Sequence, residues 1–484
     1  MENASIRKKE RGTMIQFGTG GWRAIIGEDF TKANIQILAK AMADKMIAEG
    51  VQDKGIVIGY DRRFLSKETV KWSCEVLAAV GITCHFVCRS VPTPLIMYYV
   101  MKYDFPYGMM VTASHNPSLY NGIKVFTAGG RDANQEQTDD IERYIAKVDE
   151  KEIPKVDYDW AVKEKRVIEF YPMNEYIDDI MEKVDMKAIR DAHLRIVLDP
   201  MYGVSETALG TILITGRCDM DVIHSQHDTL FGGKMPAPSV ERLQMLRTHV
   251  LDKGYDFGLA TDGDADRLGV IDDKGNYLHP NDILVLLYYY LVKYKGWSGP
   301  VVRNIATTHR LDAIAESFGE ECFEVPVGFK HISGKMAETN AIIGGESSGG
   351  LTVAGHIPGK DGVYAASLLV EMVAVTGKKL SEFMEILREK FGSCHMEERS
   401  YSFSQERKEY LQTKFFVDKE IPDVSPLSVQ KISYMDGCKI YFKNGGWLLI
   451  RFSGTEPVLR VFCEMPKKED AIMLCERIEE SYLF

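Results

Sequence analysis

The chain has 484 residues, of which 45% are hydrophobic and 27% are charged, and its net charge is −11. Length alone predicts about three to four domains, because one hydrophobic core does not extend over so many residues. Because proteins that bind nucleic acids present a basic face, this negative net charge predicts that the protein has no nucleic-acid partner. A phosphorylated small ligand would need a locally basic pocket.

The cysteines and the apolar runs predict a cytoplasmic protein with no membrane partner. The nine cysteines form no CxxC pair, which is typical of reduced thiols. The first residues, "MENASIRKKERG", contain no apolar signal core. The longest apolar run, "ILVLLYYYLV" at 283–292, is half of what a membrane span requires.

Taken in chain order, apolar strand-like runs alternate with amphipathic helical stretches. Residues 55–61 predict a strand, and 66–81 a helix with Ser66 as N-cap and Gly81 as its stop. The pattern recurs after a charged, mostly helical segment at 149–190. The later elements are a strand at 193–203, a strand–loop–strand at 255–272, a strand–turn–helix at 299–319, a hairpin at Asn444-Gly445 and a closing helix at 467–483.

This alternation predicts an α/β fold. We expect three successive mixed α/β domains. A smaller α+β C-terminal domain follows from about Arg399, where the sequence pattern changes. The predicted boundaries are residues 1–165, 166–297, 298–398 and 399–484.

The first polar cluster follows a strand-like run at 108–111. Thr112 begins the stretch "TASHNP", in which Ser114 and His115 stand side by side before an Asn-Pro that continues neither strand nor helix. A hydroxyl and an imidazole held where a strand stops are well placed for chemistry. An ordinary Ser/Asn/Pro turn explains the same pattern.

The most specific cluster is "TDGDADR" at 261–267. Asp262, Asp264 and Asp266 recur at every second residue around a small Gly/Ala backbone, so an extended turn can bring three carboxylates to one point. Such oxygen ligands suit Mg²⁺, and an unneutralised cluster would raise some carboxyl pKa values by repulsion. The alternatives are a solvated acidic hairpin turn and an EF-hand, although the Glu at the twelfth EF-hand position is missing.

Two further loops combine polar groups with glycine. In "RFSGTEPVLR", Arg451 and Arg460 bracket hydroxyls and a glycine, which is the chemistry of a phosphate cradle or of an Arg-capped hairpin. In "GGESSGG", Glu346 and Ser348 could hydrogen-bond one polyhydroxyl ligand, or the loop could be merely flexible. Near the N-terminus, "QFGTGGWRAIIG" holds Arg23 in a Gly-rich turn, as a plain loop or an anion contact.

In chain order, "TASHNP", "DGDADR", "GGESSGG" and "RFSGTEP" resemble the phosphoserine loop, metal loop, sugar loop and phosphate loop of the α-D-phosphohexomutase family, the phosphoglucomutases and phosphomannomutases. The resemblance extends from Phe17 to Arg460 and implies four domains around a central cleft. It implies an isomerase that moves a phosphoryl group reversibly between C1 and C6 of a hexose phosphate. The implied route passes through an enzyme phosphoserine and a 1,6-bisphosphate, with Mg²⁺ as cofactor and glucose 1,6-bisphosphate as activator.

The resemblance also assigns roles to residues. Ser114 would carry the phosphoryl group and complete the Mg²⁺ shell of the three aspartates. Lys124 and Arg23 would act as acid/base or charge-stabilising groups, and His115 would support the phosphate. The implied substrate-binding residues are Lys330, Glu346, Ser348, Arg267, Arg451, Ser453, Gly454, Thr455 and Arg460.

Departures from the family pattern bear on the substrate. Gly20 and Ala24 stand where Ser and Gly are usual, and the sugar loop has Gly350 in place of a His. The stretch "VGFKHI" with Lys330, together with "GHIPGKDG" at 355–362, resembles the phosphoglucomutase branch. We therefore expect glucose 1-phosphate and glucose 6-phosphate to be the substrate and the product. We expect the protein to be a monomer or a dimer. The alternatives are a phosphomannomutase, a phosphoglucosamine mutase, or a catalytically silent sugar-phosphate-binding homologue.

Overall fold

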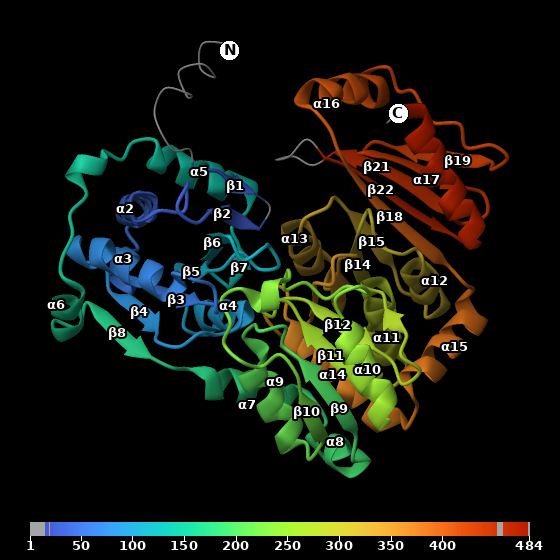
Figure 1. Ribbon diagram of the computed structural model, residues 1–484, viewed down its shortest axis with the longest axis horizontal. Coiled ribbons are helices and arrows are strands. Elements are labelled where there is room, and N and C mark those ends of the chain that lie inside the picture. Colours follow the sequence, from blue (N-terminus) through green and yellow to red (C-terminus); the bar gives the residue numbers. More distant parts are fainter. Residues whose placement is uncertain (1–14, 19, 453–457, 483–484) are drawn as a thin grey trace. The chain divides into compact units, whose positions relative to one another are not determined.

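The computed structural model describes residues 15–18, 20–452 and 458–482 (Figure 1). The chain forms two compact units, Met1–Pro280 with Ser348–Leu380, and Asn281–Ser347 with Ser381–Phe484. Among the described residues no helix has both the length and the apolar character needed to cross a membrane, and the apolar run at 283–292 is part of helix α11 (Pro280–Lys293).

The first unit opens with a sheet in the order β1-β2-β6-β5-β3-β4-β8, with β7 paired to β6. Its strands are β1 (Phe17–Gly18), β2 (Gly21–Ile25), β3 (Ile56–Tyr60), β4 (Cys84–Val87), β5 (Tyr107–Val111), β6 (Tyr120–Thr127), β7 (Arg131–Asp132) and β8 (Val167–Phe170). The strands β3, β4, β5 and β8 run parallel to one another, whereas β6 is antiparallel to β5. Because β8 lies beyond residue 165, this sheet continues past our predicted first boundary, and the boundaries stay predictions.

Helices cover both faces of this sheet, which is drawn in blue to teal in Figure 1. On one face, Ile56 and Ile58 pack into a core with α2 (Lys32–Ala48) and α3 (Ser66–Ala79). On the other face, a β-carbon at Gly59 would lie 2.4 Å from Ile96 Cδ1, so the glycine lets α4 (Thr93–Lys102) approach closely. Two more helices, α5 (Gln135–Ile145) and α6 (Tyr158–Lys163), complete this part.

One detail of α3 differs from our expectation. Ser66 is the first helical residue, and the N-cap is Leu65, which adopts a left-handed conformation with φ 63°. The Ser66 hydroxyl donates instead to Asp61 Oδ1 at 3.1 Å, because a buried carboxylate lies within its reach. The predicted stop is confirmed, since the helix ends at Ala79 and Gly81 follows with φ 87°.

The rest of the first unit contains a second sheet in the order β10-β9-β11-β12-β13. Its strands are β9 (Arg195–Asp199), β10 (Asp219–Val222), β11 (Phe257–Thr261), β12 (Leu268–Ile271) and β13 (Tyr277–Leu278). Around it lie α7 (Met173–Lys183), α8 (Met186–Ala192), α9 (Ser205–Thr215), α10 (Gln244–Lys253) and α14 (Gly362–Thr376), and the unit also contains the short strand β17 (Leu351–Val353). β11 is parallel to β9 and antiparallel to β12, so the turn between β11 and β12 lies at the carboxyl end of β11.

The second unit holds parallel strands in the order β15-β14-β16, followed by an antiparallel sheet in the order β18-β22-β21-β20-β19. The elements after α11 are β14 (Val301–Asn304), α12 (Arg310–Ser317), β15 (Cys322–Val325), α13 (Phe329–Thr339), β16 (Ile343–Gly345) and α15 (Leu380–Phe391). The antiparallel part comprises β18 (His395–Ser402), α16 (Gln405–Gln412), β19 (Val429–Ser433), β20 (Cys438–Phe442), β21 (Trp447–Phe452), β22 (Val458–Met465) and α17 (Lys468–Tyr482). The predicted fold class and the hairpin at Asn444-Gly445 are confirmed.

A tight strand contact predicts a stability effect in the first sheet. A β-carbon at Gly122 on β6 would lie 2.2 Å from the Trp22 carbonyl oxygen on β2, so Gly122→Ala must push the strands apart. We expect this substitution to lower the free energy of unfolding by about 1–3 kcal/mol, measured by thermal denaturation. Gly334→Ala on α13 is the control, because the described residues leave open space there. Equal melting temperatures for the two variants would contradict the expectation.

Candidate active site

Ser114 lies three residues beyond the end of β5, in a backbone conformation that serine rarely adopts. Its φ is 50°, and its side chain is fully buried. The Ser114 hydroxyl donates to Asp262 Oδ2 at 2.7 Å and lies 3.3 Å from His115 Nδ1. The serine loop (residues 112–119, between β5 and β6) and the acidic turn (residues 262–267, between β11 and β12) therefore meet at the Ser114 oxygen.

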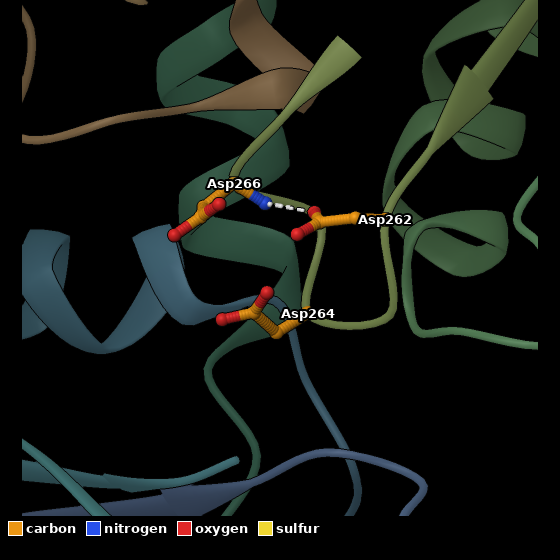
Figure 2. Close-up of side chains that lie close together, drawn as sticks. All are labelled: Asp262, Asp264 and Asp266. Atoms are coloured by element: carbon orange, nitrogen blue, oxygen red, sulfur yellow. Dashed lines mark hydrogen bonds between the residues drawn. The ribbon is translucent and has the colours of Figure 1, made fainter. Parts of the chain in front are cut away.

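The acidic turn brings its three carboxylates together, as Figure 2 shows. One oxygen from each of Asp262, Asp264 and Asp266 lies within 4.8 Å of the others. Asp262 Oδ1 accepts the backbone N–H groups of Asp266 and Arg267 at 3.1 Å, which tightens the turn. Within the described part of the chain, Asp264 Oδ1 and Asp266 Oδ1 are buried without a hydrogen-bond partner. Buried carboxylate oxygens that accept no hydrogen bond fit a hard cation such as Mg²⁺.

The three carboxyl groups do not share their charge equally. Burial, together with the charges of Asp264 and Asp266, raises the pKa of Asp262 to about 8. Burial also opposes ionisation of Asp266, but the charges of Lys124 and Lys360 hold the pKa of Asp266 well below its ordinary value. The cluster therefore holds one proton near neutral pH, on the carboxyl group that faces Ser114.

Lys124 supplies the positive charge closest to the triad. It extends from β6, and its Nζ donates to Asp264 Oδ2 and Asp266 Oδ2, both at 2.7 Å. Burial alone would lower its pKa, but these two carboxylates raise the pKa of Lys124 above its ordinary value. A lysine so held is a fixed charge, suited to stabilising a phosphoryl group and unsuited to accepting a proton.

Arg23 and Arg267 add positive charge around the serine loop. Arg23 Nη1 donates to Asn116 Oδ1 at 2.6 Å, and burial, with the charge of Arg267, lowers the pKa of Arg23. The charge of Arg267 and burial also lower the pKa of His115 well below its ordinary value, so this imidazole is neutral. A β-carbon at Gly20 would lie 2.6 Å from Arg23 Nη2, which relates this departure from the family pattern to the position of Arg23.

Two residues that sequence reasoning did not assign also contact the triad. Thr93 Oγ1 donates to Asp264 Oδ2 at 2.6 Å, and Lys360 Nζ lies 3.0 Å from Asp266 Oδ2. A β-carbon at Gly350 would lie 2.1 Å from Lys360 Cδ, so the missing side chain at 350 makes room for the lysine stem. The signal in the sequence is Gly350 together with the lysine of the "GKDG" stretch, which the resemblance relates only to the phosphoglucomutase branch.

The sugar-loop residues fall in both units. Glu346 follows β16 in the second unit, and its Oε1 accepts the Gly328 N–H at 3.2 Å. Gly328 is the N-cap of α13, whose first turn carries the half-buried Lys330, so the hydrogen bond from Gly328 links Glu346 to the start of the helix that carries Lys330. Ser348 is exposed and belongs to the first unit.

The predicted phosphate loop is bracketed by two arginines. Arg451 on β21 and Arg460 on β22 are direct cross-strand partners, and like charges placed so repel unless an anion offsets them. Arg451 Nε donates to Asp436 Oδ2 at 3.0 Å, and the same oxygen accepts the Val327 N–H at 2.8 Å. Ser453, Gly454 and Thr455 lie outside the described residues.

The chain matches all four domain families of the phosphoglucomutases and phosphomannomutases. Alpha/beta/alpha domains I, II and III match residues 14–152, 174–275 and 279–391, and the C-terminal domain matches 418–481. A phosphoglucomutase/phosphomannomutase of Thermococcus kodakarensis is 30% identical, over 94% of this chain and 95% of its own length.

Two further relatives agree with these matches. A Methanosarcina acetivorans protein named as a phosphoglucosamine mutase is 31% identical, over 97% of this chain and all of its own length. The crystal structure of a Thermus thermophilus protein named as a phosphomannomutase superposes with a TM-score of 0.84 at 28% identity, covering 97% of this chain and 99% of that one. The chain therefore belongs to the α-D-phosphohexomutase family and is an isomerase of the mutase type.

Proposed function

We propose that the protein interconverts glucose 1-phosphate and glucose 6-phosphate, with Ser114 as the carrier of the phosphoryl group and glucose 1,6-bisphosphate as intermediate. The observation that carries the proposal is the contact of the Ser114 hydroxyl with Asp262, beside two carboxylate oxygens that have no hydrogen-bond partner among the described residues. A structural turn does not require a buried serine bonded to one member of a carboxylate triad, whereas phosphoryl transfer depends on such positioning and charge.

The chain's own residues have distinct tasks in this reaction. Asp262, Asp264 and Asp266 would hold Mg²⁺, which when bound offsets charge on the transferring phosphoryl group. Lys124, Lys360, Arg267 and Arg23 surround the serine loop with fixed positive charge. Neutral His115 can share a hydrogen bond with the Ser114 oxygen. Arg451 and Arg460, with Ser453, Gly454 and Thr455, would bind the phosphate that is not being transferred.

The proposed sugar preference rests on two sequence motifs. Lys330 in "VGFKHI" and Lys360 in "GKDG" support glucose phosphates, as in the phosphoglucomutase branch. Glu346 and Ser348 would hold hydroxyls that glucose and mannose share. The relatives named as phosphoglucosamine mutases and phosphomannomutases make mannose and glucosamine phosphates the alternatives.

Mutase turnover tests this proposal. Glucose 1-phosphate, mannose 1-phosphate and glucosamine 1-phosphate are supplied in parallel with Mg²⁺ and a trace of the matching bisphosphate. We expect glucose 1-phosphate to give the highest kcat/KM, and Ser114→Ala to abolish turnover on every sugar. A higher kcat/KM for another sugar would overturn the glucose preference. Full activity of Ser114→Ala would overturn the role of the serine.

The pKa of Asp262 predicts how Mg²⁺ binding depends on pH. Below about 8, the triad must release one proton when the cation binds, so affinity is expected to rise about tenfold per pH unit and to level off above about 8. Calorimetric titration of the protein with Mg²⁺ across this range is the measurement. Asp262→Asn, which has no proton to lose there, is expected to bind more weakly and with little pH dependence. An affinity for the unsubstituted protein that is flat below pH 8 would contradict this prediction.

The close contact between Gly350 and Lys360 predicts a coupled effect on turnover. Gly350→Ala would displace the Lys360 stem from Asp266, and Lys360→Met would remove its charge. Each is expected to lower kcat by about tenfold or more, and the double variant no further, because both remove one interaction. Gly334→Ala serves as the control with unchanged kcat. Multiplying effects in the double variant would show that the two residues act separately.

A further inference from the structure

Arg63 lies beneath the serine loop and contacts its backbone at several points. Its Nη2 donates to the carbonyl oxygens of Ser114 at 2.7 Å and Asn116 at 2.6 Å. Its Nη1 donates to the carbonyl oxygens of Pro117 and Tyr120, both at 2.9 Å. One guanidinium therefore holds four carbonyls within seven residues of chain, which uses the planar fork that distinguishes arginine from lysine.

The N–H group of Ser114 is held by a second set of hydrogen bonds, which leads through Thr112 to Asp61, close to Arg63 in the chain. The Ser114 N–H donates to Thr112 Oγ1 at 2.8 Å, and the Thr112 hydroxyl donates to Asp61 Oδ2 at 2.6 Å. The other oxygen of Asp61 accepts the Arg63 N–H at 2.9 Å. The short stretch after β3 thus holds Ser114 through both its carbonyl oxygen and its N–H group.

Arg63 is shielded from water and from any ligand. Its side chain is buried, and the guanidinium carbon lies 4.9 Å from the centre of the Phe231 ring, which covers it. It contacts none of the three triad carboxylates by hydrogen bond or ion pair among the described residues. Its position suits a group that acts through the loop and does not touch a substrate.

The loop requires such support, because Ser114 adopts a left-handed backbone conformation at φ 50°. A residue with a β-carbon stays in that conformation only when its surroundings hold it there. The conformation directs the hydroxyl to Asp262, and a displacement of about 1 Å at a reacting oxygen costs roughly 100-fold in rate. The hydrogen bonds to Ser114 therefore bear on its reactivity as well as on the fold.

We propose that Arg63, with Asp61, is a positioning residue that fixes the backbone of Ser114 for phosphoryl transfer. The proposal rests on the proposed function, since it assigns these residues to the carrier serine. A purely structural role would lower stability in general, whereas a positioning role changes kcat and the local opening of the serine loop at similar stability.

Arg63→Lys is the decisive variant, because it keeps the charge but cannot reach four carbonyls. We expect kcat to fall about 100-fold with KM within about threefold of the original, since substrate contacts are intact. Hydrogen–deuterium exchange of residues 112–122 is expected to accelerate, while exchange in β9 and β11 stays unchanged. Arg62→Lys is the matched control, because the Arg62 guanidinium donates to the Ser225 carbonyl and contacts no atom of the serine loop in the described residues. It is expected to retain full kcat.

Thr112→Val tests the hydrogen bonds that join Asp61 to the Ser114 N–H group. It replaces Arg63→Lys as the test if that variant does not fold. It removes the hydroxyl between Asp61 and the Ser114 N–H, and we expect the same fall in kcat with the same local exchange. Unchanged exchange at 112–122, or a kcat within about threefold of the original, would overturn the positioning role. If the unsubstituted protein turns over no hexose phosphate, the proposed function fails, and the exchange measurement still decides whether Arg63 holds the loop.

Discussion

Three aspartates buried at one point impose the constraint on which the rest of the site depends. Carboxylates so close together repel one another, and the fold offsets that repulsion by two means. Lys124 and Lys360 place ammonium groups against Asp264 and Asp266, and Asp262 retains a proton near neutral pH. What remains is a pair of carboxylate oxygens with no donor among the described residues and a serine hydroxyl directed at the third carboxyl group. A divalent cation would complete that balance, which is why the same residues that create the repulsion can bind the metal.

Within each unit, the same topological rule places polar side chains at the ends of strands. Ser114, Asp262 and Glu346 each follow a strand that is paired in parallel with a neighbour, namely β5, β11 and β16. Loops at the carboxyl ends of parallel strands are where open α/β sheets bind ligands. In the first unit this rule places the serine loop and the acidic turn in contact, while β6 returns beside β5 and carries Lys124.

Much of this arrangement could be predicted from sequence, because the informative residues are close together along the chain. The acidic turn, the serine loop and the paired arginines each lie within one short motif between strand-like runs. Lys360 and Arg63 escaped prediction, since their partners lie far away in sequence, as with the 51 residues that separate Arg63 from Ser114. Ser66 is not the N-cap for a different reason, because its hydroxyl bonds to the buried carboxylate of Asp61, whose partner the local pattern does not indicate. The attachment of β8 to the first sheet likewise depends on pairing with β4, which no local pattern indicates.

The central claim is that Ser114 accepts a phosphoryl group and passes it on. The direct measurement is mass spectrometry of the protein after incubation with Mg²⁺ and glucose 1,6-bisphosphate, followed by addition of glucose 1-phosphate. The account predicts that one phosphoryl group appears on Ser114 and that it is lost as new bisphosphate forms. A protein that remains unmodified, or that carries the phosphoryl group on another residue, would contradict it.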